Sequence, residues 1–168
     1  MSVNGKQKGN TWERKVANYL SEHFKEWMGV DQSFRRAIDS GSYFGGKNQK
    51  RIETHLEEHQ NFGDILTPTP FRFEIECKAY KTPPTLDSLL KQQYKKFDQW
   101  IEQAEQDALN SNKDALLIIK FNNTMPFVLI ANPKYTGCAL MVYHGYYMFN
   151  MDMFFQVHPD EWFFDPIK

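Results

Sequence analysis

The stretch of sequence that decides the fold is Asn61-Phe-Gly-Asp64-Ile-Leu-Thr-Pro-Thr-Pro-Phe-Arg-Phe-Glu-Ile-Glu76-Cys-Lys78. Apolar and charged residues alternate strictly between positions 71 and 78, apart from the small thiol at 77, which is typical of a β-strand with one apolar and one charged face. Alternate residues of a strand point to the same side. The pattern therefore places Glu76 and Lys78 next to each other on the charged face.

The residues before this strand predict a second strand beside it. The prolines at positions 68 and 70 interrupt the chain and favour a turn. Residues 63–66 can then run antiparallel to residues 73–78 as the other arm of a hairpin. We expect this pairing to bring Asp64 close to Glu76.

Two carboxylates and a lysine in this arrangement suit metal-assisted cleavage of a phosphodiester bond. Mg²⁺ takes one or two carboxylates together with waters and substrate phosphate oxygens. Asp64, Glu76 and the backbone carbonyl of Cys77 are therefore candidate metal ligands. The Lys78 ammonium is placed to orient the attacking water and to neutralise the pentacovalent state. The alternative is an exposed strand face on which acids and lysine merely pair with each other.

The segment before the hairpin predicts a helix and a short strand. Apolar residues recur at helical spacing from about residue 11 to residue 27. Asn10 or Thr11 would cap this helix, and Glu13 would fall in its first turn, where the helix dipole favours a carboxylate. The simplest interpretation of Glu13 is that its charge only stabilises the start of this helix. Residues 34–36 then form a short strand that runs into a loop rich in glycine and serine.

Taken in order, these residues form a pattern that resembles the PD-(D/E)XK nuclease superfamily, and within it the archaeal-type and phage Holliday junction resolvases. Those enzymes open with a Lys-Gly-x-x-x-Glu-Arg helix, continue with an arginine near a Ser-Gly loop, and place an aspartate on one strand and Glu-x-Lys on the next. The matching residues here are Lys8, Gly9, Glu13, Arg14, Arg36, Ser40, Gly41, Asp64, Glu76 and Lys78.

The resemblance, which covers about residues 6–131, implies roles for these residues. Asp64 and Glu76 would bind the divalent metal, and Glu13 would support the metal site from the helix, through a water. Lys78 would serve the nucleophilic water, and Ser40 would lie beside the scissile phosphate. Related nucleases often carry a glutamine on a later helix near the active site. The candidates here are Gln99 and Gln103, and the sequence does not choose between them.

Three features depart from the family pattern. Gly63 stands where the family usually has proline before the aspartate, and Cys77 replaces a common aliphatic residue. The segment from residue 45 to residue 62 is longer than expected, which affects how the loop would meet DNA.

Composition indicates one domain, residues 1–168, because 168 residues with 41% hydrophobic content can bury one proper core. No run of apolar residues is long enough to span a membrane, and no secretory leader is evident, so we expect a cytoplasmic protein, acting in the host cytoplasm if phage-encoded. Cys77 and Cys138 are too few for a disulfide framework and are expected to be reduced, buried thiols.

The charge is unevenly distributed along the chain. Residues 1–51 carry a net charge of +5 and residues 52–168 carry −6. The basic end holds the Ser-Gly loop and can contact phosphates without reading sequence. The predicted DNA-binding residues are Lys8, Arg35, Arg36, Ser42 and Lys47. A second basic cluster, residues 78–96, flanks the Glu-x-Lys motif, although solvated surface lysines explain it equally well.

The remaining sequence predicts helices and strands that support the fold. A long amphipathic helix is predicted at residues 85–109 with caps at Thr85 and Asn110, followed by strands at 115–121 and 127–131. The fold class is therefore α/β: a restriction-endonuclease-like core, in which helices flank a mixed central β-sheet in α-β-β-β-α-β-β order. An aromatic-rich extension follows residue 132. Most of its residues are expected in the core, with one or two further strands around residues 144–145, and a subunit interface is the alternative.

Three functions are consistent with these observations. The first is a Mg²⁺-dependent structure-selective endodeoxyribonuclease, with Mn²⁺ able to substitute, that resolves four-way DNA junctions as a homodimer. The second is a restriction-type or end-processing DNA nuclease on the same fold. The third is a non-catalytic nucleic-acid-binding module, against which the intact set of Glu13, Asp64, Glu76 and Lys78 argues.

Overall fold

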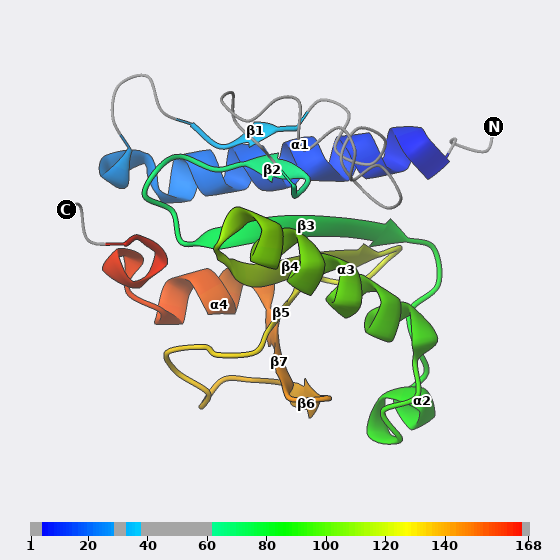
Figure 1. Cartoon of the computed structure of the whole chain (residues 1–168). Coiled ribbons are helices and arrows are strands. Elements are labelled where there is room, and N and C mark those ends of the chain that lie inside the picture. Colours follow the sequence, from blue (N-terminus) through cyan, green and yellow to red (C-terminus); the bar gives the residue numbers. More distant parts are fainter. Residues whose placement is uncertain (1–4, 29–32, 38–61, 166–168) are drawn as a thin grey trace.

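A computed structural model describes residues 5–28, 33–37 and 62–165 of the chain (Figure 1). The predicted loop residues Ser40, Ser42 and Lys47 lie outside these ranges. In chain order the elements are α1 (Gly5–His23), the 3-10 helix η1 (Lys25–Trp27), β1 (Arg35–Arg36), β2 (Ile65–Leu66), β3 (Phe73–Tyr80), α2 (Leu86–Leu90), α3 (Lys95–Ser111), β4 (Asp114–Phe121), β5 (Phe127–Ile130), β6 (Met141–Tyr143), β7 (Tyr146–Asn150), α4 (Met151–Val157) and the 3-10 helix η3 (Asp160–Phe163).

The strands form one mixed sheet in the order β1-β2-β3-β4-β5-β7-β6. β3 and β4 are parallel, and the connection between them carries α2 and α3, as a parallel crossover requires. The other neighbours are antiparallel, including the predicted pairing of β2 with β3, in which Ile65 lies opposite Ile75. The α/β fold with a mixed central sheet is confirmed.

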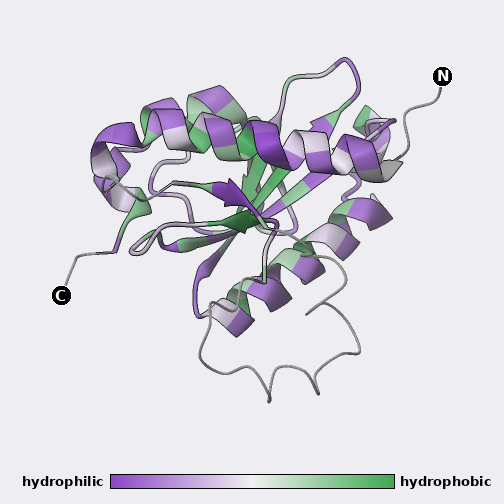
Figure 2. Cartoon of the chain, turned by 90° about the horizontal axis from the view of Figure 1, so that it is seen from above, coloured by the Kyte–Doolittle hydropathy of each residue, from purple (hydrophilic) through white to green (hydrophobic). Residues whose placement is uncertain are grey.

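Helices cover both faces of the sheet (Figures 1 and 2). Residues of β4 alternate between two apolar clusters, because successive side chains of a strand point to opposite faces. Leu116 and Ile118 pack in a cluster with α1, α4 and η3, whereas Leu117 and Ile119 pack in a second cluster with α3. Both clusters exclude water almost completely, so the central strands are fixed from two sides.

The first helix differs from the prediction at both ends. α1 includes Gly5 at its start, so Asn10 and Thr11 lie inside the helix and do not cap it. The Thr11 hydroxyl instead donates to the carbonyl of Gln7, 2.7 Å away, one turn earlier. Glu13 consequently lies in the third turn and not in the first, and its interpretation as a capping charge is wrong. The α-helix ends at His23, and η1 completes the predicted span.

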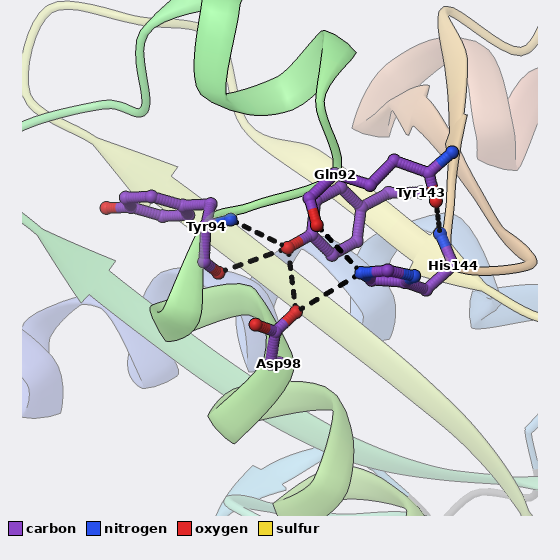
Figure 3. Close-up of polar contacts among 5 residues, drawn as sticks. All are labelled: Gln92, Tyr94, Asp98, Tyr143 and His144. Carbon is purple, nitrogen blue, oxygen red and sulfur yellow. Dashed lines mark hydrogen bonds and ion pairs between the residues drawn. The ribbon is translucent and has the colours of Figure 1, made fainter.

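The long helix predicted at residues 85–109 is broken into α2 and α3. The break contains Gln92, whose φ of 52° is in the left-handed region. Contacts with the β6–β7 turn hold the break in place (Figure 3). The backbone N–H of His144 donates to Gln92 Oε1 at 2.8 Å, and the Tyr143 hydroxyl accepts from the Tyr94 N–H at 2.9 Å and donates to Asp98 Oδ1 at 2.7 Å. These partners are 45 or more positions apart in the chain, so local helical spacing could not reveal the break.

The caps of this region agree in part with prediction. Thr85 caps α2, because its hydroxyl accepts from the N–H of Ser88, whereas α3 ends at Asn112 and not at Asn110. Asn112 adopts the left-handed conformation that commonly ends a helix.

The aromatic extension completes the core, as expected for most of its residues. It adds β6 and β7, with the turn at residues 144–145, and then α4. Phe149, Phe154, Phe155 and Phe163 are almost fully buried. Cys77 is buried as predicted, whereas Cys138 is only partly buried. Within the described ranges, no helix has both the length and the apolar character needed to cross a membrane.

Candidate active site

Asp64 is held rigidly where β2 diverges from β3. Its N–H donates to the carbonyl of Ile75 at 2.9 Å, and its carbonyl accepts from the N–H of Ala37 at 2.9 Å. Its side-chain Oδ2 accepts from the N–H of Cys77, also at 2.9 Å. Backbone groups of two chain segments, β3 and the residue after β1, therefore fix both the position and the direction of this carboxylate.

Gly63 allows the chain just before Asp64 to lie close against β3. A Cβ at this position would lie 2.6 Å from Glu74 Oε1 and 2.6 Å from the carbonyl oxygen of Ile75. The N–H of Gly63 donates to the same Glu74 oxygen at 2.8 Å. Proline has both a Cβ and no N–H, so the departure from the family pattern at this position follows from the presence of Glu74.

The structure brings Glu76, Lys78 and one of the two candidate glutamines together. Glu76 is only 3% exposed and forms an ion pair with the Lys78 ammonium. The same ammonium donates to Gln103 Oε1 at 2.8 Å. Both candidate glutamines are exposed on α3, and Gln103 is the one that contacts Lys78. Lys78 is fixed between β3 and α3.

Glu13 reaches the site from α1 and pairs with Arg36 of β1. Arg36 Nε lies 2.6 Å from Glu13 Oε2, and both side chains are mostly buried. Arg36, predicted to contact DNA, thus neutralises a site carboxylate in this structure. The neighbouring Arg35 is exposed, and its Nε donates to the hydroxyl of Ser33 at 2.8 Å. Of the two arginines, Arg35 has the more accessible side chain.

The carboxylates of the site act strongly on each other. Burial and then the negative charge of Asp64 raise the pKa of Glu76 to about 8, although the Lys78 ammonium opposes this change. Burial and then Asp64 also raise the pKa of Glu13. The protein therefore gathers negative charge at a place where water is scarce. A proton or a cation lowers the free energy of such a cluster.

A further acid, Asp107 of α3, lies next to this group and was not predicted from the sequence. Its residue is 9% exposed, and burial, followed by the charges of Glu74 and Asp64, raises its pKa to about 6. Gln103, Asp107 and Ser111 are spaced four residues apart and therefore follow one side of the helix. This row flanks the apolar stripe of α3 and is the signal that could have identified Asp107.

The donor set fits a hard divalent cation. Asp64 and Glu76 supply carboxylate oxygens near enough for one charge to raise the pKa of the other. No group of three or more His, Cys, Asp or Glu side chains suited to holding a metal is found among residues 5–28, 33–37 and 62–165. Mg²⁺ needs only one or two carboxylates, because waters and substrate oxygens complete its coordination. The two acids are thus sufficient protein ligands.

Comparison with known families bears on this site. A family model described as "Phage putative PDDEXK endonuclease" matches residues 4–162. The chain belongs to this PDDEXK endonuclease family. The superfamily resemblance drawn from the sequence motifs is thereby confirmed. A search of curated proteins found no match.

Among solved structures, the chain is similar to Hjc of Archaeoglobus fulgidus, a Holliday junction resolvase from an archaeal hyperthermophile. The identity is 12% and the TM-score is 0.40, over 86% of this chain and 88% of that one.

The protein is therefore a PDDEXK-type nuclease, and nucleases of this type generally use divalent metal ions. Among its predicted DNA-binding residues, Lys8 of α1 is located near the end of β3. Its ammonium donates to the side chain of Asn122 and lies 3.5 Å from the carbonyl oxygen of Tyr80. This basic group therefore lies at the same strand that carries Glu76 and Lys78.

Proposed function

We propose that this nuclease is a Mg²⁺-dependent, structure-selective endodeoxyribonuclease that resolves four-way DNA junctions. The observation that carries the chemical part of this proposal is the meeting of Asp64, Glu76 and Lys78 beside the β2–β3 pairing, with Gln103 bonded to Lys78. A non-catalytic binding module has no need for an acid buried next to a second acid at this cost in desolvation.

Asp64, Glu76 and the backbone carbonyl of Cys77 would hold the metal ion. When bound, Mg²⁺, or Mn²⁺ in its place, supplies a water of lowered pKa and stabilises charge on the phosphoryl oxygens. Asp64 enters this role already oriented by the Cys77 N–H, which limits the reorganisation that binding requires. Glu13 supports the site from α1 while Arg36 offsets its charge.

Lys78 would orient the attacking water and neutralise charge that develops on the phosphate. Its ammonium has three donors. Glu76 and Gln103 accept from it in this structure, which fixes the direction of the remaining donor. A preorganised donor of this kind needs no rearrangement during the reaction.

Branched DNA is proposed as the substrate and a homodimer as the active assembly. The motif order resembles that of junction resolvases, and a four-way junction presents two symmetry-related strands. A two-fold dimer is the simplest assembly that cuts both strands before it dissociates. Restriction-type or end-processing activity on linear DNA is the competing possibility, because the metal motif does not encode the geometry of the DNA.

The test is cleavage of labelled four-way junction, flap, splayed arm, linear duplex and single-stranded DNA, with Mg²⁺, with Ca²⁺ and with chelator. We expect Mg²⁺ or Mn²⁺ to permit cleavage with a preference for the junction. Ca²⁺ should permit binding only, because it accepts a looser coordination geometry. Light scattering at micromolar concentration should show a dimer.

Each part of the proposal can fail separately. Cleavage of linear duplex as fast as of junction, by a monomer, would move the assignment to a general or end-processing nuclease. Rapid cleavage in excess chelator would exclude the metal mechanism altogether.

A further inference from the structure

The charged face of β3 does not end at the catalytic lysine. Tyr80 follows Lys78 by two residues, so it continues the same face about 6.6 Å further along the strand. Its side chain is 37% exposed at the end of β3. The active site therefore borders an aromatic ring that reaches solvent.

Two residues of α3 surround this ring. The Lys96 ammonium lies 4.1 Å from the centre of the Tyr80 ring, and the Trp100 ring meets it edge-on with the ring centres 5.8 Å apart. Lys96, Trp100 and Gln103 are separated by four and three residues, so they follow one side of the helix. The helix surface that holds Lys78 through Gln103 thus also holds Lys96 over Tyr80.

Lys96 differs in its bonding from the lysines that pair with acids. Lys78 and Lys91 form ion pairs with carboxylates, which compensate their charge. Within the part of the chain that the structure describes, Lys96 makes no ion pair and is held by the neutral ring of Tyr80. A cation–π contact fixes an ammonium without neutralising it. Lys8, bonded to the neutral oxygens of Asn122 and Tyr80, supplies a second such charge nearby.

The opposite end of the same strand face carries buried acids and basic groups that already have partners. Glu74 and Asp107 lie there, and both are almost fully buried. Arg72 at that end pairs with Asp114, and Lys113 is partly buried and donates to the Thr67 hydroxyl. On the other side, Lys96 over Tyr80 is a positive group that no carboxylate of the described residues pairs with. This difference along β3 favours a bound strand that continues toward Tyr80.

We propose that Lys96, held over Tyr80, is a phosphate-binding subsite for the cleaved DNA strand, about one or two nucleotides from the scissile phosphate. This inference rests on the proposed nuclease function and extends it. The Lys96 ammonium contacts a phosphodiester oxygen, and Lys8, at the backbone carbonyl of Tyr80, adds a second positive charge near the same end of β3. The Tyr80 ring restricts Lys96 to this place, which reduces the rotamer entropy lost on binding.

The test measures binding of a labelled four-way junction to the Ca²⁺-loaded protein over a range of salt concentrations. Lys96→Gln should weaken binding and reduce the slope of log affinity against log salt by about 1, as expected for one lost phosphate contact. Lys134→Gln is the matched control, since Lys134 also lies over a tyrosine ring, that of Tyr135, at 5.8 Å. This control should bind with the wild-type slope.

Two substitutions at Tyr80 separate the ring from its hydroxyl. Tyr80→Phe keeps the ring and should keep the wild-type slope. Tyr80→Leu removes the ring and should reduce the slope as Lys96→Gln does. If Tyr80→Phe and Tyr80→Leu behave alike, the ring does not position Lys96, and the proposal is wrong.

A neutral methylphosphonate at one position of the cleaved strand locates the contact. Placed one or two nucleotides from the cleaved bond, it should lower the slope for wild type and have no further effect in Lys96→Gln. Equal effects in both proteins would overturn the proposal while leaving the nuclease assignment intact. Absence of both DNA binding and Mg²⁺-dependent cleavage in the wild type would overturn the function and the subsite together.

Discussion

The two faces of β3 differ sharply in chemistry. Phe73, Ile75 and Cys77 point into the apolar cluster formed with α1 and α4. Glu76 and Lys78, on the other face, form the candidate active site with Gln103 of α3. One eight-residue strand thus contributes both to the core and to the chemistry.

This difference shows how the fold tolerates the destabilising effect of buried carboxylates. Buried carboxylates destabilise a fold unless a partner compensates them. Burial of each large apolar side chain on the other face contributes roughly 1.5–3 kcal/mol. Substitutions on the apolar face should therefore change stability, and substitutions on the charged face should change catalysis. The following predictions test that division, from the largest effect to the smallest.

Asp64→Asn should reduce cleavage by at least about 10³-fold, because a metal ligand worth several kcal/mol of transition-state stabilisation is lost. The amide oxygen can still accept from the Cys77 N–H, so the fold should persist. Single-turnover cleavage and circular dichroism measure the two effects. Activity within tenfold of wild type would show that Asp64 is not a metal ligand.

Ile75→Ala should lower the free energy of unfolding by about 2–5 kcal/mol, since Ile75 is completely buried. The backbone carbonyl that accepts from Asp64 remains, so cleavage per folded molecule should change little. Urea unfolding and active-site titration separate stability from activity. A large loss of cleavage with unchanged stability would contradict the division between the faces.

Asp107→Asn should stabilise the metal-free protein at pH 7 by about 1–3 kcal/mol. The pKa of Asp107 is raised to about 6 in the folded protein, against about 3.9 in an unfolded chain. Wild-type stability should therefore fall as pH rises from 4 to 6, because the unfolded chain releases this proton first. Asp107→Asn has no such loss of stability. The difference in free energy of unfolding between the variant and wild type should therefore vanish below pH 4.

Urea unfolding in chelator at several pH values checks this prediction. Asp87→Asn, at an exposed position on α2, is the control and should show no comparable gain. An Asp107→Asn protein that is less stable than wild type at pH 7 would mean that the carboxylate has a stabilising partner.

Gln103→Ala should reduce cleavage by roughly fivefold, because one hydrogen bond to Lys78 is lost and Glu76 still holds the ammonium. Gln99→Ala on the exposed surface of the same helix should have no effect. Single-turnover rates of the two variants provide the comparison. Equal rates for both would remove Gln103 from the site.

Much of the site could be predicted from the sequence because its signals are local. The alternation at residues 71–78 and the turn prolines placed Asp64 and Glu76 together, and the motif order indicated the family. Other features required contacts between distant parts of the chain. Gln103 was distinguished from Gln99 only by its bond to Lys78, and Asp107 was recognised only by its proximity to Glu74.

The break between α2 and α3 escaped prediction for the same reason. Residues 85–109 have a continuous helical pattern, and Gln92 is compatible with a helix interior. The left-handed turn there is stabilised by His144 and Tyr143, which sequence periodicity does not connect to it. The absence of proline before Asp64 is likewise explained only by the close approach of Glu74 and the Ile75 carbonyl to Gly63.

The most direct test of the central claim, that the charged face of β3 is a metal-dependent cleavage site, is the single-turnover cleavage rate of Glu76→Gln in Mg²⁺. It is measured beside wild type, with junction binding in Ca²⁺ as the control for folding. Cleavage should fall by at least about 10³-fold while binding stays within about threefold, because affinity comes chiefly from basic residues that contact phosphates. Full Mg²⁺-dependent cleavage by Glu76→Gln would contradict the claim.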